Sequence, residues 1–332
     1  MFYTIEDSVR VSRSVGRRPR DFISDELRGW RWSEPPVSYV GSTQLSVSDV
    51  SGGLCPVGRD VYLRYVARVK ESINPSLQKG QLIHGTYEAA IRTVKRVLYS
   101  EEASNGVELM GVMKNYGEAE LRRMLKSQEW ILSEDFIRRV FWDLWGKASS
   151  IYAGALDKVK SRSIYLSLES IVNAVVPLSA EVVVDGSLIG LSRSLRMDAV
   201  LDPGIPIEIK TRPPNRIYET ALAGYALALE SQFEAPVDFG VLVYVNVNGP
   251  SVLVHEHIIP ISDQLRIEFL HERDRRGELV DKGIDPGLAS KCNNWCPFLK
   301  YCGGGEEKDT AGGRVGRSSG VKKRAHSTVE KG

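Results

Sequence analysis

Strand and helix patterns alternate over residues 177–280, and their order limits the fold that this chain can adopt. Two valine-rich runs surround an Asp-Gly turn pair, as in a β-hairpin. The run IPIEIKT is expected to form a third strand directly after the turn residues 202–204. A helical pattern over 215–230, two further strands and a helix over 263–276 follow. We therefore expect an α/β fold built on a mixed central sheet.

The chain that precedes these strands has helical patterns. Apolar residues recur at helical spacing over residues 80–100, and His84 lies near the start of this expected helix. Helical patterning continues from Gly117 to about Val176 with almost no strand signal. We therefore expect an all-helical insertion over residues 101–176.

The two ends of the chain differ from its middle in composition. Residues 1–36 combine five arginines between positions 10 and 20 with the run Trp30-Arg31-Trp32 and a Pro-Pro pair, which predicts an irregular arm. This basic and aromatic content suits a nucleic-acid contact or a docking surface. An arm whose tryptophans pack on the domain and whose arginines are solvated is an equal alternative. Residues 303–332 are glycine-rich and almost without apolar content, so we expect a disordered, mildly basic tail.

Composition excludes several classes of protein. With 332 residues, of which 42% are hydrophobic and 26% charged, the chain can build a core, so disorder throughout is excluded. Its 44 basic and 42 acidic side chains nearly cancel, so a nucleic-acid surface must be a local patch. No apolar run reaches the roughly 18 residues of a membrane span. We expect a cytoplasmic protein with no membrane contact. The absence of a phosphate-binding loop argues against a nucleotide-driven motor.

Carboxylates and a lysine come together around the third expected strand. Side chains alternate along a strand, so Ile207 and Ile209 face one side while Glu208 and Lys210 share the other. Asp198 is expected at the end of the preceding strand, and the intervening turn can bring it beside Glu208 as a second hard ligand for Mg²⁺ or Mn²⁺. The lysine could then orient or help deprotonate a water and offset phosphate charge. The alternative is a Glu-Lys pair on a solvated face.

The chain has four cysteines, and three of them lie close together. Cys292, Cys296 and Cys302 have the spacing C-x(3)-C-x(5)-C, while Cys55 lies far upstream. Four cysteines without a surplus predict one Cys₄ site, and both Zn²⁺ and an iron–sulfur cluster take four thiolates. The alternative, four buried thiols that act as small hydrophobic groups, fits the close triplet less well. Such a site would be structural and would tie the Cys55 segment to the C-terminal region.

The block D-x(9)-E-I-K resembles the core of the RecB-like PD-(D/E)xK nucleases, because a G-x-x-x-H helix precedes it and a helix with Tyr225 follows it. The resemblance implies that His84, Asp198, Glu208 and the carbonyl of Ile209 bind the divalent metal. It also implies that Lys210 assists the attacking water and that Tyr225 contributes to the catalytic site. The chain departs from the family at Ala221, where many members carry Gln four residues before the helical Tyr.

A second resemblance concerns the cysteines. One distant cysteine followed by a C-terminal triplet is similar to the arrangement in RecB-like nucleases with an iron–sulfur clamp, which favours a [4Fe–4S] cluster over zinc on Cys55, Cys292, Cys296 and Cys302. Together with the LRGWRW segment, these motifs resemble a CRISPR-associated exonuclease of the Cas-four type, in its archaeal Csa-one branch, over about residues 22–303.

This resemblance implies metal-dependent trimming of single-stranded DNA ends before the CRISPR integrase inserts the fragments as new spacers. DNA, the integrase and other adaptation proteins would be the partners. Two alternatives stay open: a non-catalytic DNA-binding or scaffold subunit of the adaptation complex, and a DNA-repair nuclease of the same fold outside CRISPR. We expect six segments: the arm 1–36, the segment 37–100 with Cys55 and the first core helix, the helical insertion 101–176, the nuclease core 177–280, the cysteine clamp 281–302 and the tail 303–332.

Overall fold

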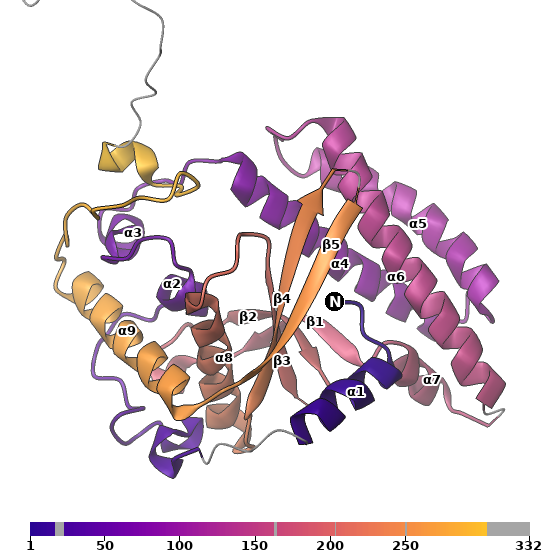
Figure 1. The fold of residues 1–332 in the computed structure, drawn as a ribbon, viewed down its shortest axis with the longest axis horizontal. Helices are drawn as coiled ribbons and strands as arrows, with labels where there is room; N and C mark the ends of the chain where they lie inside the picture. Colours follow the sequence, from indigo (N-terminus) through magenta and orange to yellow (C-terminus); the bar gives the residue numbers. More distant parts are fainter. Residues whose placement is uncertain (17–22, 163–164, 203, 250, 304–332) are drawn as a thin grey trace, which may run out of the picture.

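A five-stranded mixed sheet forms the centre of the computed structural model, which describes residues 1–16, 23–162, 165–202, 204–249 and 251–303 (Figure 1). The strand order is β1-β2-β3-β4-β5. Neighbouring strands are antiparallel except β3 and β4, which are parallel and are joined through helix α8. The predicted α/β fold with a mixed central sheet is confirmed. The strands are β1 Leu178–Val184, β2 Leu195–Leu201, β3 Ile205–Lys210, β4 Phe239–Asn248 and β5 Ser251–Pro260.

Helices cover both faces of this sheet and form two cores. Helices α4, α5 and α6 lie on one side and α8 and α9 on the other (Figure 1). Ile207 and Ile209 of β3 belong to the core with α4 to α7, and strand alternation turns Glu208 and Lys210 away from it. The helices are α1 Ile5–Gly16, α2 Val47–Ser51, α3 Arg59–Val61, α4 Pro75–Tyr99, α5 Gly106–Lys126, α6 Glu134–Arg162, α7 Leu168–Val175, α8 Ile217–Phe233 and α9 Asp263–Asp281.

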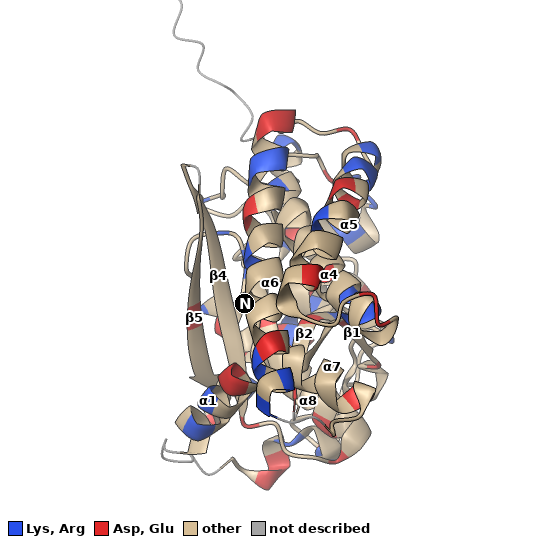
Figure 2. Ribbon diagram, turned by 90° about the vertical axis from the view of Figure 1, so that its right-hand side faces the viewer, with Lys and Arg blue, Asp and Glu red and all other residues tan. Residues whose placement is uncertain are grey.

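Residues 101–176, the expected helical insertion, contain helices α5, α6 and α7. The Trp145 indole on α6 donates a hydrogen bond to the Met113 carbonyl oxygen on α5 at 2.8 Å and is buried. Figure 2 shows basic and acidic residues mixed along α5 and α6. Many of these residues are paired along the helix, such as Arg138 with Glu134. This side of the insertion therefore presents no surface of a single charge. None of the described helices is long and apolar enough to cross a membrane.

The N-terminal region differs from the irregular arm that the sequence predicts. Residues 5–16 form helix α1, and its first turn is fixed because Asp7 accepts hydrogen bonds from the backbone and hydroxyl of Thr4. Val11 on this helix is buried, so the spacing of its few apolar residues outweighs the local density of arginines. Residues 17–22, which hold three of the five arginines, and the predicted tail at 304–332 lie outside the described residues.

The rest of this N-terminal region packs on the domain. The Arg28 side chain is largely buried and donates to Glu230 of α8 at 2.7 Å, while Arg266 of α9 pairs with the same carboxylate at 2.7 Å. Trp32 stays exposed. The segment with the 3₁₀ turns Asp25–Leu27 and Gly29–Arg31 thus joins the second core through Leu27. Short turns are 3₁₀ at Asp25–Leu27, Gly29–Arg31, Ser187–Ile189 and Leu299–Cys302, and π at Tyr62–Val66.

Candidate active site

Strand pairing brings the two predicted carboxylates together. The register of β2 against β3 pairs Ala199 with Ile207, so Asp198 and Glu208 are the next residues along the two strands. The sequence predicts Asp198 at the end of a strand, but the structure places it inside β2. The strand continues to Leu201 because that residue still pairs with Leu178 of β1. The predicted neighbourhood of the two carboxylates is nevertheless found.

Glu208 forms a buried ion pair with Lys210. The Lys210 ammonium donates to Oε1 of Glu208 at 2.5 Å and lies 5.0 Å from the ring centroid of Tyr218. Burial and the nearby Asp198 charge raise the pKa of Glu208, although Lys210 opposes this shift. Burial alone would lower the pKa of Lys210, but the charge and hydrogen bond of Glu208 outweigh it and raise that pKa. Lys210 is therefore a charged hydrogen-bond donor at neutral pH.

His84 approaches Asp198 from helix α4. Its Nδ1 lies 2.9 Å from Oδ1 of Asp198, and the backbone N–H of Ile209 donates to Oδ2 of the same carboxylate at 2.6 Å. Burial opposes the charged form of both side chains, but their mutual attraction raises the pKa of His84 and lowers the pKa of Asp198. The helix, the two strands and four of the predicted site residues therefore meet at one point.

Helix α8 supplies the remaining predicted residue. Tyr225 lines the same pocket, and its hydroxyl donates to the carbonyl oxygen of Arg196 at 3.0 Å. Burial raises the pKa of Tyr225, so its hydroxyl stays protonated. Ala221, one turn earlier, is buried in the core and brings no polar group to the pocket. Tyr218, on the same helix, contacts the ammonium group of Lys210.

A pocket of about 440 Å³ is lined by the side chains of His84, Asp198, Glu208, Lys210 and Tyr225. Sequence reasoning missed two further residues on its walls, Arg212 and Trp295. The Arg212 guanidinium lies 4.0 Å from the centroid of the Trp295 ring. Period-two spacing puts Arg212 on the same face as Glu208 and Lys210 in the sequence, which is a signal that could have found it, although β3 ends at Lys210. Trp295 gives no local signal, because it comes from a segment far along the chain.

The four cysteines line one small pocket, and all of them are free. The Asn293 amide donates to the carbonyl oxygens of Gly53 and Leu54, each at 3.3 Å, which joins the two cysteine-bearing segments. Nη1 of Arg59 lies 3.5 Å from the sulfur of Cys302. Burial raises the pKa of the Cys296 thiol. The tertiary structure therefore gathers the distant cysteine and the C-terminal triplet in one place.

The donor atoms in the carboxylate pocket and in the cysteine pocket fit the divalent cation and the Cys₄ centre that the sequence predicts. One place offers two carboxylates, an imidazole and a carbonyl oxygen, which suit a hard divalent cation, and the other offers four thiols. In the described part of the chain, however, no three His, Cys, Asp or Glu side chains stand in positions that could hold a metal ion. His84 and a backbone N–H contact the two oxygens of Asp198, and Lys210 contacts Oε1 of Glu208. Metal binding at these carboxylates thus requires their side chains to exchange partners.

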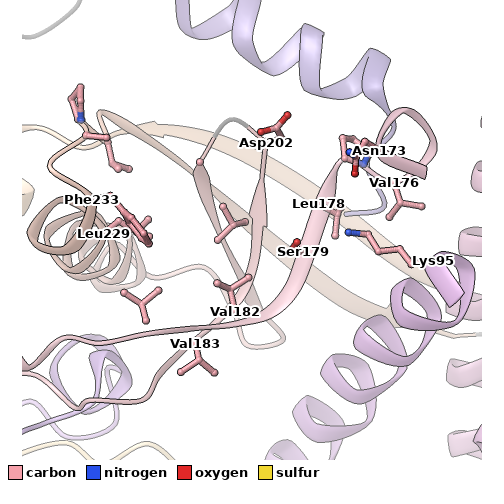
Figure 3. Close-up of a pocket in the computed structure, with 17 residues that line it drawn as sticks. Lys95, Asn173, Val176, Leu178, Ser179, Val182, Val183, Asp202, Leu229 and Phe233 are labelled. Atoms are coloured by element: carbon pink, nitrogen blue, oxygen red, sulfur yellow. The ribbon is translucent and has the colours of Figure 1, made fainter. Parts of the chain in front are cut away.

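A larger pocket of about 560 Å³ lies elsewhere, along β1 and the end of α8 (Figure 3). Its walls are mostly aliphatic, and Figure 3 shows Leu229 and Phe233 on the α8 side and Lys95 on the opposite side. It contains none of the predicted site residues and no adjacent pair of carboxylates. The smaller pocket is therefore the candidate active site.

The mixed sheet and this pocket define an α/β protein whose acidic and basic groups suit hydrolysis of a phosphodiester. The model of one protein family, described as CRISPR-associated exonuclease Csa1, matches residues 1–306. A protein of Saccharolobus solfataricus with the same description is 40% identical over 304 residues, which cover 91% of this chain and 99% of that protein. A Thermoproteus tenax protein of that description is 29% identical, over 84% of this chain and 91% of its own length. The chain belongs to the Csa1 family of CRISPR-associated exonucleases.

Proposed function

We propose that this protein is a metal-dependent DNA exonuclease that trims single-stranded DNA ends. The observation that carries the proposal is the convergence of Asp198, Glu208 and Lys210 in one pocket, with His84 against the first carboxylate. The two relatives named above are called CRISPR-associated exonucleases, which supports the same activity in this chain. The products would be fragments ready for the CRISPR integrase and other adaptation proteins, and the work would take place in the cytoplasm.

In this proposal Asp198, Glu208, His84 and the carbonyl of Ile209 hold Mg²⁺ or Mn²⁺. The bound cation would lower the pKa of a water and polarise the phosphoryl oxygen. Lys210 keeps its proton because Glu208 raises its pKa, so it acts as a donor that orients the water and offsets phosphate charge, and not as a base.

The remaining groups act by positioning. The Tyr225 hydroxyl donates to the backbone of β2 two residues before Asp198, so it fixes the strand that carries this carboxylate. Tyr218 packs on the Lys210 ammonium and restricts its rotation.

We further propose that the four cysteines bind a [4Fe–4S] cluster. Support comes from their convergence in one pocket between the segment around Cys55 and the C-terminal triplet. The thiols lie apart from the carboxylates, so the cluster would hold the fold together and take no part in the hydrolysis.

The activity is tested with anaerobically purified full-length protein and end-labelled single-stranded DNA. In Mg²⁺ or Mn²⁺ we expect progressive shortening of the labelled strand, and EDTA should stop it. Circular single-stranded DNA is the matched control, because it has no end and should stay intact. Binding of the linear strand without any shortening would contradict the proposal and favour a scaffold subunit.

The pH dependence of metal binding tests the role of His84. Asp198 raises the pKa of His84 above its ordinary value near about 6.5. Protonated His84 cannot bind a metal, and it stays paired with Asp198. Mn²⁺ affinity should therefore rise with pH, by up to about tenfold per pH unit, until the pH passes the raised pKa of His84. Calorimetric titration between about pH 6 and pH 8 measures it. The His84→Ala protein should bind more weakly with a flatter profile. Equal profiles for both proteins would exclude His84 as a ligand.

A further inference from the structure

Arg212 is a basic side chain of the candidate active site that pairs with no carboxylate in the described part of the chain. Arg212 lines the pocket, whereas Lys79 of α4 is not among the lining residues. Within the described residues, neither forms an ion pair with a carboxylate. Arg64, on the same pocket, differs because it pairs with Asp49 and, at 2.7 Å, with Glu71. Glu71 therefore pairs with Arg64, and it attracts Arg212 only from farther away, without an ion pair.

This arrangement is unfavourable for the protein alone. Both side chains are partly buried, and burial lowers the pKa of Arg212 and of Lys79, while the Arg212 charge lowers the Lys79 pKa further. A cation that has lost water and forms no ion pair with a carboxylate is destabilised. An anion next to Arg212 would reduce this penalty. Because Arg212 lines the pocket, it is placed to receive a negative group there.

Trp295 holds Arg212 in a defined orientation. The guanidinium stacks on the Trp295 ring at 4.0 Å and donates a hydrogen bond to the Tyr218 hydroxyl, which leaves its other N–H donors for a ligand. The backbone around Trp295 is itself fixed, because Asn74, the residue that caps α4, donates to the Trp295 carbonyl oxygen at 3.1 Å. The Ser72 N–H donates to the Pro297 carbonyl oxygen at 2.9 Å. The stacking platform is thus anchored to the start of the helix that carries Lys79.

We propose that Arg212 binds a backbone phosphate of the single DNA strand that enters this pocket, and that Trp295 is the positioning residue that aims Arg212 at it. A guanidinium matches two phosphate oxygens with two parallel hydrogen bonds. The pocket also holds Asp198, Glu208 and Lys210, so a phosphate bound here keeps the strand at the reacting groups. The inference rests on the proposed nuclease function and names a substrate contact for it.

The test measures binding of a fluorescent single-stranded oligonucleotide by anisotropy, in EDTA and over a series of salt concentrations. The Arg212→Gln protein should bind about tenfold more weakly or worse, as expected for the loss of a charged hydrogen bond. The slope of log affinity against log salt should shrink by about 0.7, the value for one phosphate contact on a single strand. Unchanged affinity and slope for the Arg212→Gln protein would overturn the proposal.

Arg96→Gln is the matched control. Arg96 also stacks on an aromatic ring, that of Tyr116, at 4.1 Å, but it lies at the far end of α4 and does not line the pocket. Its replacement should leave affinity and salt slope unchanged. Equal losses of affinity and slope from Arg96→Gln and Arg212→Gln would overturn the proposal, since they would show a general effect of charge.

Thermal stability separates binding from a structural role. Because Arg212 forms no ion pair within the described residues and burial opposes its charge, Arg212→Gln should keep the melting temperature. Trp295→Phe should retain DNA affinity through its ring, while Trp295→Ala should lose it. A lower melting temperature with wild-type affinity in Arg212→Gln would show a structural residue and overturn the proposal.

Cleavage by the unaltered protein in Mn²⁺ is measured in parallel, so that the two proposals fail separately. Cleavage by the unaltered protein together with wild-type binding by Arg212→Gln would overturn the phosphate site alone. Weaker binding by Arg212→Gln without any cleavage by the unaltered protein would support the phosphate site and overturn the nuclease. An unaltered protein that does not bind the strand would overturn both.

Discussion

Replacing Glu208 by Gln is expected to remove most DNA cleavage while DNA binding persists. The substitution keeps the shape of the side chain but removes the charge that a divalent cation needs. Metal activation of water is worth several kcal/mol of the barrier, and about 1.4 kcal/mol corresponds to tenfold in rate. We therefore expect a loss of at least about 100-fold in the rate of shortening of end-labelled DNA.

Glu268→Gln is the matched control for this substitution. Glu268 lies on α9, partly exposed, and pairs with Arg216 at 2.9 Å outside the pocket. Because Glu208→Gln leaves Lys210 without its partner in a buried place, circular dichroism must show that the variant is folded. Wild-type cleavage by a folded Glu208→Gln protein, free of host nucleases, would remove the active-site assignment and favour the scaffold alternative.

The neighbouring residues give a graded series. Asp198→Ala and Lys210→Ala should also remove most cleavage, whereas His84→Ala should be milder. Two carboxylates can retain a cation that accepts water in the vacant position.

Replacing Cys55 by Ala is expected to cost the protein both its proposed cluster and much of its stability. The unaltered protein should be brown, with absorbance near roughly 400 nm and about four iron atoms per chain. Because binding of such a centre is coupled to folding, losing it should cost several kcal/mol and lower the melting temperature by roughly 10 °C or more. Cys292→Ala, Cys296→Ala and Cys302→Ala should have the same effect. Iron content, the visible spectrum and thermal melts measure it.

Lys291→Ala is the matched control, since Lys291 lines the cysteine pocket next to Cys292 but has no sulfur. It should keep its iron and its melting temperature. Colourless protein with one zinc per chain would contradict the iron–sulfur assignment. If Cys55→Ala alone kept a complete cluster, the set of one distant cysteine and a C-terminal triplet would be wrong.

Local patterns in the sequence were sufficient to predict the order of the elements and most of the candidate site. Strand alternation placed Glu208 and Lys210 on one face because it depends only on the backbone of a single strand. The short connection after β2 then left few ways to arrange Asp198 against Glu208. Helix α1 was missed because few of its residues are apolar, and only its packing shows the buried face of Val11.

The sequence by itself determined which residue types the protein has for its chemistry: two carboxylates, a lysine and a histidine near one sheet, and a single set of four cysteines. Only the tertiary structure decided which of these residues line the same pocket. Trp295 stacks on Arg212, although the two residues lie 83 positions apart in the chain. Strand β2 extends beyond Asp198 because its last residues pair with β1. No local pattern encodes such contacts, because they depend on packing between segments that are distant in the chain. For this reason the carboxylate site could be predicted from sequence, and the stacking of Trp295 on Arg212 could not.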